Sequence, residues 1–384
     1  MMGDVRVRIE AGWALEQVRP IFGAQSGSGT TSTCVLFGRR TGAAAPPPAV
    51  VERWQGALPR RDANEAEAAH ALTKTQAPWP RPRTLIGVSP YRDRFRQGAT
   101  IVPRRFFLTE PEAVSRLAAR RDAPVVRGRV GALDKAPWTG VTPPRGPVET
   151  QFLRQMALGE SVAPFRMLAT FTTVIPADGC TLIDSRAAEE AGHRYLAAWL
   201  RDVESKWAEY SNKNSDGLPR MTVNEQINNM RKLTSQLGPQ GIRVIYPASG
   251  TRMCAARVPS DDLIVEHAAY WCTVKSIAES GYLLSILNSD LVIAKIVDLQ
   301  PRGEVGPRHF DNLVWTLAIP EYDPAEPLHQ HLAAAAARAE TVAAAVDLSA
   351  AAHFTAKRRA IRAALAEAGV AQQIEALVDA LLPP

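Results

Sequence analysis

The amino-acid sequence predicts a mixed α/β protein: an irregular, sheet-containing domain, an antiparallel helical hairpin inserted into it, and a helical C-terminal tail. Three observations predict this fold class. Short stretches rich in Val, Ile, Phe and Thr alternate with prolines in the first half of the chain. Two segments within 185–238 carry apolar residues at helical spacing, and the chain becomes alanine-rich with a helical pattern after Pro320. We therefore expect three parts, at 1–48, 49–320 and 321–384.

The first part is expected to contain two strands and a linker. The strands are predicted at Val5–Ile9 and Thr33–Phe37. The Gly/Ser/Thr-rich segment between them, 23–32, lacks the Gly-Lys-Ser/Thr of a phosphate-binding loop, so we interpret it as a connector. The Ala/Pro run at 41–48 cannot pack or continue a helix, and it predicts a linker to the second part.

Most of the second part is expected to be strands and Pro-rich loops. Over 81–107, prolines exclude a long helix and favour strands. A short helix is predicted at Val148–Leu158. Enrichment in β-branched and aromatic residues predicts further strands at 165–175, 242–246, 252–258 and 263–271.

The helical hairpin, 185–238, is predicted from two amphipathic segments. The first, Ser185–Tyr210, has an apolar face of Trp and Tyr residues with Val203 at helical spacing, which is more typical of packing than of a ligand site. The second begins at the capping-box sequence Thr222–Glu225 and ends at Gly238. A polar loop joins the two, so we expect an antiparallel pair that forms a separable structural insertion.

Helical signals also follow the last predicted strand. A capping-box sequence at Ser276–Glu279 predicts a helix through Ser289. In the tail, a helix is predicted from Asp323 to about Ala345, and two more are expected on either side of Gly369.

Composition excludes several classes of protein. The longest apolar run, 332–346, is interrupted by Arg338 and Glu340 and is too short to span a membrane. The first ten residues contain four charges and no apolar core, so we expect no signal peptide and a cytoplasmic location. The four cysteines include no Cys-x-x-Cys pair, which excludes a zinc ribbon and predicts reduced, buried thiols.

The positive charge of the chain is concentrated in one window. Residues 81–130 contain twelve Arg and four acidic residues, a net charge of +8, whereas the whole chain carries +6. Such a block predicts a polyanionic partner, namely nucleic acid. The alternative interpretation is a solvated surface, since Arg outnumbers Lys throughout the sequence.

The arginines themselves suggest how DNA would be bound. The planar guanidinium can form two hydrogen bonds with a phosphate or a guanine edge, which Lys cannot. If 92–96 is a strand, Arg92, Arg94 and Arg96 share one face, while Arg104 and Arg105 point to opposite faces. Trp79 and Tyr91 would be able to stack on bases, although aromatic residues beside prolines more often pack in loops.

Other chemical motifs have simpler interpretations. The Glu204-Ser205-Lys206 triplet matches a nuclease pattern, but it lies mid-helix without an upstream Pro-Asp and is expected to form surface ion pairs. His329 and His331 are two residues apart on a predicted helix and therefore do not share a face for a metal ion. His309 is a lone histidine, which we expect to be structural. We predict no metal site and no catalytic residues in this chain.

Five segments of the sequence together carry a resemblance to a known family. They are Phe95–Phe107, Val244-Ile245-Tyr246 with Ser249-Gly250, the helix Tyr282–Ser289, Arg308-His309-Phe310 leading to Ile319-Pro320, and the tail Ile374–Leu382. In this order, over roughly residues 30–384, they resemble the C-terminal region of N6-adenine DNA methyltransferases from restriction–modification and phage-defence systems. Phe95–Phe107 resembles the family's "Phe…Gly-Ala…Pro-Arg" strand, and the segment from Arg308 to Pro320 resembles its closing strand.

The sequence departs from this family in its catalytic half. The family binds S-adenosylmethionine at a Gly-containing strand–loop–helix and holds a flipped adenine with an Asn/Asp-Pro-Pro-Tyr/Phe loop. Neither motif is present; Pro143-Pro144 lacks both the Asn/Asp and the aromatic residue. The resemblance therefore implies a target-recognition domain without a cofactor of its own. S-adenosylmethionine is expected on a catalytic partner, and this chain would be a specificity subunit, a split gene product or a truncated remnant.

The expected function is sequence-specific recognition of double-stranded DNA as the specificity part of an adenine-specific (N6) DNA methyltransferase. The catalytic subunit of that methyltransferase, or another defence-system protein, is the expected protein partner, and no membrane is involved. One alternative is a complete but diverged methyltransferase, and another is a helical interaction subunit of a defence complex. The residues proposed to contact DNA are Arg92, Arg94, Arg96, Arg104, Arg105, Arg252 and Arg308.

Overall fold

The structure is a computed structural model that contains two compact units. Unit 1 consists of Met1–Val88 and Lys295–Leu317, and unit 2 of Ser89–Ala294 and Ala318–Pro384. The described residues are 13–22, 33–40, 49–56, 59–60, 63–78, 88–113, 120–131, 134–258, 262–300, 302–303, 306–307 and 309–382.

Unit 1 contains a four-stranded sheet in the order β2-β1-β3-β4. Strand β1 (Trp13–Phe22) pairs antiparallel with β2 (Thr33–Arg40) and parallel with β3 (Val50–Gly56), which pairs antiparallel with β4 (Leu72–Pro78). Strand β2 confirms the strand predicted at Thr33–Phe37. The predicted strand at 5–9, connector at 23–32, linker at 41–48 and residues 79–87 lie outside the described residues.

Two further parts of unit 1 are short. Helix α1 (Glu65–Ala71) begins at a capping box in which Asn64 and Glu67 each accept a hydrogen bond from the other's backbone N–H. The second segment of the unit contributes the paired strands β19 (Arg302–Gly303) and β20 (Gly306–Pro307) and the 3-10 turns η8 (Val297–Leu299) and η9 (Leu313–Thr316).

One half of unit 2 is built from small sheets covered by helices. Strands β6 (Thr109–Pro111), β7 (Val125–Gly128) and β8 (Arg145–Pro147) form an antiparallel sheet, and β9 (Leu153–Ala157) lies between β12 (Phe171–Val174) and β17 (Ile264–Val265). Shorter elements are α2 (Arg104–Phe107), β10 (Val162–Ala163), β11 (Arg166–Met167), β13 (Ala177–Asp178) and β14 (Thr181–Leu182), with the 3-10 turns η3 (Trp138–Gly140), η4 (Thr150–Phe152) and η5 (Gly159–Ser161).

The other half of unit 2 has a sheet packed against long helices. Its strand order is β16-β15-β18-β5, formed by Ala256–Val258, Ile242–Pro247, Ala269–Val274 and Arg96–Gln97. Helix α6 (Ile277–Asn288) is buried almost throughout, which explains why apolar residues occur on all its sides. The remaining helices are α7 (Asp290–Ile296), α8 (Pro327–Ala345), α9 (Phe354–Glu367) and α10 (Val370–Leu381).

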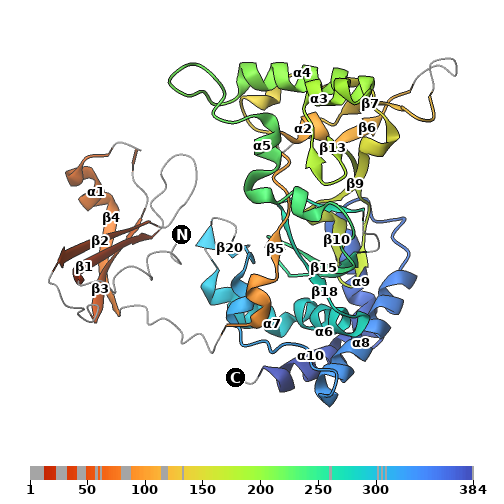
Figure 1. Ribbon diagram of the computed structural model, residues 1–384. Helices are drawn as coiled ribbons and strands as arrows, with labels where there is room; N and C mark the ends of the chain where they lie inside the picture. The colour runs from red at the N-terminus through yellow and green to blue at the C-terminus, as the bar shows by residue number, and fades with distance from the viewer. Residues whose placement is uncertain are drawn as a thin grey trace. The chain divides into compact units, whose positions relative to one another are not determined.

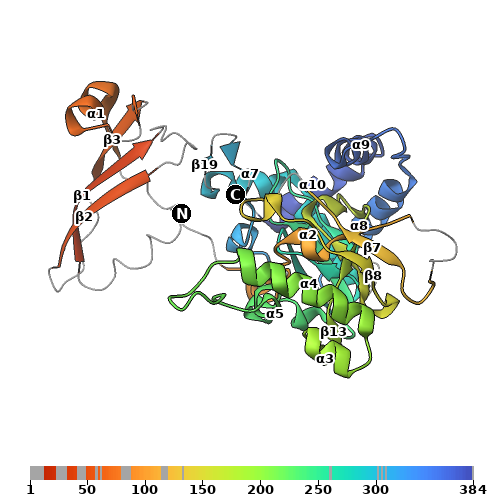
Figure 2. The ribbon, with the colours of Figure 1, turned by 90° about the horizontal axis from the view of Figure 1, so that it is seen from above.

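The halves of unit 2 lie at opposite ends of it. Figure 1 shows α3 (Ser185–Glu190) and α4 (Arg194–Tyr210) across one end, and α6, α8 and α10 together at the other, with β5 between them. In Figure 2, viewed from above, α3 and α9 are again on opposite sides. Strand β5 therefore lies between the two halves, at the edge of the second sheet.

The mixed α/β fold class is confirmed, with several small sheets and a helical tail. Strand β15 and helix α6 lie where they were predicted, and the first tail helix, α8, ends at Ala345 as predicted but begins at Pro327 rather than Asp323. Gly369, in the left-handed conformation at φ 70°, separates α9 from α10. Among the described residues, no helix alone has the length and apolar composition to cross a membrane, and α6 with α7 does so only as a pair bent by 60°.

Three local predictions were wrong. Residues 90–93 form the 3-10 turn η2 (Pro90–Asp93) rather than a strand, because Ser89 Oγ accepts from Tyr91 N and Pro90 favours a first helical turn. Segment 148–158 forms the 3-10 turn η4 and strand β9 rather than a helix, because backbone pairing of β9 with β12 outweighs its helical propensity. The helix expected over 185–210 is two helices, because Gly192 has φ 82°.

The prediction of a long second helix in the hairpin was also wrong. Helix α5 (Val223–Ile227) ends after five residues and is followed by the 3-10 turns η6 (Asn229–Arg231) and η7 (Thr234–Gln236). The Asn228 side chain accepts from Thr234 N and Oγ1, in place of continued helical hydrogen bonds. The hairpin is not a separable insertion either, because Trp199 and Leu200 share one core with Phe106 and Phe152.

Candidate nucleic-acid interface

Arg105 is buried inside the fold. Its side chain is about 3% exposed, and Nη2 lies 2.8 Å from Asp134 Oδ2, which is also nearly buried. Arg105 Nη1 donates to the Val141 carbonyl as well. A guanidinium with this burial and these partners cannot reach a duplex on the surface, so we leave Arg105 out of the candidate interface.

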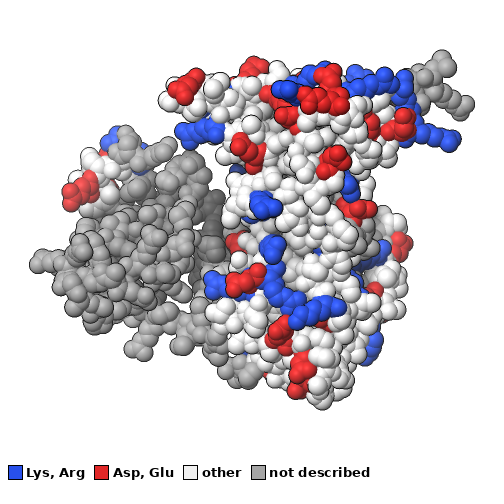
Figure 3. Space-filling view, viewed as in Figure 1, with Lys and Arg blue, Asp and Glu red and all other residues white. Residues whose placement is uncertain are grey.

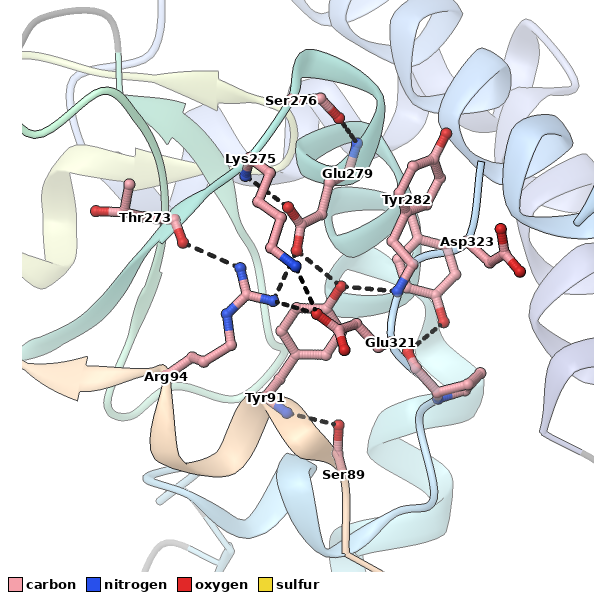
Figure 4. Close-up of polar contacts among 12 residues, drawn as sticks. Ser89, Tyr91, Arg94, Thr273, Lys275, Ser276, Glu279, Tyr282, Glu321 and Asp323 are labelled. Carbon is pink, nitrogen blue, oxygen red and sulfur yellow. Dashed lines mark hydrogen bonds and ion pairs between the residues drawn. The ribbon is translucent and has the colours of Figure 1, made fainter. Parts of the chain in front are cut away.

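Arg94 belongs to a polar network that joins three segments of unit 2. Figure 4 shows its guanidinium among Tyr91, Glu279 and Glu321. Arg94 Nη1 lies 2.8 Å from Glu279 Oε1, and Nη2 donates to the Thr273 carbonyl at 3.2 Å. Burial alone would lower the pKa of the Arg94 guanidinium, but the hydrogen bond and charge of Glu279 outweigh burial and raise that pKa.

Tyr91 is the second member of this network. Its hydroxyl donates to Glu279 Oε1 at 3.0 Å and accepts from Tyr322 N at 3.0 Å. The ring is fully buried, and burial raises the pKa of the phenol. Tyr91 is therefore unable to stack on a base, and the network fixes η2 against α6 and the segment after Pro320. Trp79, the other aromatic considered, lies outside the described residues.

Arg104 neutralises a buried carboxylate. Its Nη2 lies 2.7 Å from Glu266 Oε1, and Nε donates to the same oxygen at 2.9 Å. Burial of Glu266 would raise its pKa, but the His267 ring, 2.6 Å from Oε1, and the Arg104 charge outweigh burial and hold that pKa below its usual value. Arg104 is only partly exposed, so most of its charge is committed to Glu266.

The other arginines considered from sequence differ in exposure. Arg252 is exposed, and its Nε donates to Asp290 Oδ1 at 3.1 Å. Arg308 lies outside the described residues. Elsewhere in the basic window, Arg127 pairs with Glu110, and Arg129 lies over the Phe171 ring. Three arginines of the basic window, Arg94, Arg104 and Arg105, are therefore balanced by acids from outside the window.

We call four cations of unit 2, carried by η2, β5 and the turn at η6, the β5–η6 surface: Arg92, Arg96, Arg231 and Lys232. Arg92, Arg96 and Arg231 are exposed, and none has an ion-pair partner among the described residues. Lys232 Nζ donates to the amide oxygen of Gln97 at 2.8 Å. Figure 3 shows basic side chains in a column that runs from the lower end of α5 over the region of β5 in Figure 1, with acidic atoms near both ends of the column.

Close backbone packing holds β5 in this position. Tyr270 and Trp271 of β18 pair with Gln97 and Arg96. Directly after β5, Gly98 donates from its N–H to the Ala269 carbonyl, and a Cβ at Gly98 would lie 2.3 Å from the Val265 carbonyl oxygen. Only glycine fits so close to another backbone. Gly98 belongs to the segment that resembles the methyltransferase family. Its close packing allows β5 to lie at the sheet edge, where the Arg96 side chain is exposed.

Sequence reasoning missed the contribution of η6. Arg231 and Lys232 were placed inside a regular helix, so their exposure on a turn was not predicted. The available signal was the Asn228-Asn229 pair, since Asn favours turns and tolerates the left-handed conformation. Met230 and Arg231 do adopt that conformation, at φ 55° and 60°.

The remaining motifs have structural roles. Glu204 accepts from Ser185 N, and Lys206 pairs with Asp202, so neither forms a nuclease site. His329 Nδ1 accepts from Asp323 N, which gives this ring a structural role. Groups of His, Cys, Asp and Glu that would hold a metal ion are absent among the described residues. Of the thiols, Cys254 and Cys272 are buried as predicted, whereas Cys180 is exposed.

The fold is similar to that of a restriction–modification enzyme. The Type IIL restriction-modification enzyme MmeI, solved in complex with DNA, matches 96% of this chain with a TM-score of 0.50 and 12% sequence identity. The type IIG restriction endonuclease BpuSI matches 98% of the chain with a TM-score of 0.32 and 12% identity. This chain spans 43% of the length of MmeI and 45% of that of BpuSI. No family model and no curated protein matches the sequence.

Proposed function

We propose that this chain binds duplex DNA as the target-recognition part of an N6-adenine DNA methyltransferase in a restriction–modification system. The observation that carries the proposal is the β5–η6 surface, where three exposed arginines lack an ion-pair partner among the described residues. Unpaired cations gathered on one side attract a polyanion, and each cation that meets a phosphate releases a condensed counterion.

The chemistry of the surface suits a duplex. Arg92, Arg96 and Arg231 each present a planar fork that fits a phosphate or a guanine edge. Lys232 adds a point charge to this surface, and its position is fixed by the hydrogen bond to the Gln97 amide oxygen. Phosphate contacts would position the protein, and base contacts would select the sequence. The similarity to MmeI, which was solved with DNA, supports the same assignment at the level of the fold.

S-adenosylmethionine is proposed to bind a separate catalytic partner. Nucleotide-type cofactors bind at the carboxyl ends of parallel strands joined by a crossover helix. In unit 1, β1 pairs in parallel with β3, but the described residues between them form strand β2. The described residues of this unit therefore do not fit the cofactor, and the N6-adenine assignment depends on the sequence resemblance.

A salt titration of duplex binding by the full chain tests the proposal. The duplexes are one enriched from a randomised pool by this chain and one of shuffled sequence. In the variant Arg92→Gln/Arg96→Gln/Arg231→Gln, log affinity should depend on log salt with a slope flatter by up to about three units. The matched control is Arg186→Gln/Arg201→Gln/Arg359→Gln, which removes the same charge elsewhere and should keep the parent slope.

Other outcomes separate the competing functions. If the triple variant binds both duplexes like the parent, the β5–η6 surface is only solvated and the proposed interface is wrong. S-adenosylmethionine binding by the isolated chain in calorimetry, or methyl transfer to unmethylated DNA, would instead favour a complete but diverged methyltransferase. If the chain binds no duplex at moderate salt, a helical interaction subunit remains the better explanation.

A further inference from the structure

Met230 is the most exposed large apolar side chain among the residues whose burial the structure describes. It is 82% exposed, whereas the next, Ile277, is 63% exposed. Its backbone and that of Arg231 are both in the left-handed region, which non-glycine residues seldom adopt. Two such residues in succession are maintained only where the surrounding structure imposes them, and they concentrate at binding sites. The fold therefore holds Met230 outward rather than leaving it out by chance.

The turn that carries Met230 is anchored on both sides. Ile227 before it and Leu233 after it are buried in the core that also contains Trp207. The Asn228 side chain accepts from Thr234 N at 3.0 Å and from Thr234 Oγ1 at 3.1 Å. A tip closed in this way loses little conformational entropy when it binds, which favours its use in recognition.

The surroundings of the tip combine apolar, polar and basic residues, and Met230 and Arg231 line an open pocket with Leu182 and Met221. Asn229 and Arg231 flank Met230 in the chain, and Lys232 joins the tip to Gln97 of β5. The nearby Glu225 carboxylate accepts from Thr222 N and Oγ1 in a capping box and is thereby engaged. Apolar side chains beside basic ones match a ligand with stacked apolar groups between anionic ones, and duplex DNA has that arrangement.

We propose that Met230 is a wedge that enters between two stacked base pairs of the duplex. This inference rests on the proposed DNA-binding function and deepens it. Architectural and base-reading proteins insert apolar side chains, Met among them, at base steps and thereby unstack and kink the duplex. The thioether is flexible and polarisable and makes favourable contacts with aromatic faces. Arg231 and Lys232 would hold the phosphates beside the opened step.

The test uses two duplexes of equal length and composition, one fully paired and one with a single central mismatch. A mismatched step costs less to unstack, so a wedge binds it more tightly. The full chain should prefer the mismatched duplex by roughly tenfold, and 2-aminopurine beside the mismatch should brighten on binding. Met230→Ala should lose the preference and the fluorescence change but keep the parent salt slope, because phosphate contacts remain.

Two controls make the result specific to this side chain. Met230→Leu keeps an apolar side chain and should retain most of the preference, and Ile277→Ala removes an exposed apolar residue elsewhere and should change nothing. If Met230→Ala prefers the mismatched duplex as strongly as the parent, or if the parent shows no preference, the proposal that Met230 is a wedge is wrong. The proposed DNA binding is not contradicted by either result. If the parent binds neither duplex, the proposed function itself fails.

Discussion

Lys232 donates a 2.8 Å hydrogen bond to the side-chain oxygen of Gln97, and this bond joins η6 to strand β5 across 135 residues of the chain. Gln97 in turn donates from its Nε2 to the His267 carbonyl at 3.0 Å. The edge strand of one sheet and a turn from the other half of unit 2 are thereby fixed side by side. The β5–η6 surface exists because of this contact between distant segments.

Replacing Gln97 with Glu is expected to weaken DNA binding. The new carboxylate would pair with Lys232 and place a negative charge on the surface that faces the phosphates. The loss of affinity should be largest at low salt and shrink as salt rises, because exposed charges are screened. Gln330→Glu on α8 is the matched control and should bind like the parent. Equal affinity of Gln97→Glu and parent at low salt would contradict this prediction.

Replacing Arg105 with Ala should destabilise the fold. The change leaves the Asp134 carboxylate buried without its partner, at an expected cost of about 3–5 kcal/mol in the free energy of unfolding. Arg127→Ala removes an ion pair with exposed partners and should cost less than about 1 kcal/mol. Urea denaturation of both variants measures the difference, and similar midpoints would show that Arg105 is not needed for stability.

The Arg104–Glu266 pair should make stability dependent on pH in the acid range. The folded pKa of Glu266 is lowered, so its contribution is present above the pKa of an unfolded glutamate and is lost as pH falls through the folded value. Removing the Arg104 charge raises that folded pKa, so Arg104→Met should lose most stability at neutral pH and approach the parent as pH falls through the parent's lowered folded pKa. Denaturant titrations from neutral to acid pH provide the measurement. A constant difference between the two proteins would mean that Arg104 acts through packing alone.

Each of the α4 tryptophans should contribute substantially to stability. Trp199 Nε1 donates to the Phe106 carbonyl at 3.1 Å, and Trp207 Nε1 donates to the Met221 carbonyl at 2.7 Å. Substitution of either by Ala is expected to cost about 3–5 kcal/mol. Substitution by Phe keeps much of the volume and should cost less, with the remainder reporting the lost indole hydrogen bond. Unchanged melting temperatures for the Ala variants would indicate that these side chains serve an interface instead.

The sequence was sufficient for elements defined by local signals. Ser276 accepts from Glu279 N at the start of α6, and Gly369 ends α9, as each local pattern predicted. The ion pairs of the arginines were not predictable, because the partners are distant in the chain. Arg104 and Glu266, for example, are 162 residues apart. Composition gives the amount of charge in a window but not its pairing. Arg92 and Arg96 were predicted as candidates and are exposed, whereas Arg231 and Lys232 were missed because a helix was expected there.

In the anchored turn around Met230, the residues that stabilise the fold and the residues exposed on the surface occupy different positions. Ile227 and Leu233 contribute to the core, while the three residues at 229–231 are exposed. Substitution of these three side chains would leave the core intact. The binding preference of this surface can therefore change during evolution without a loss of stability. Homologous chains are therefore expected to vary at 229–231 and to keep apolar residues at 227 and 233.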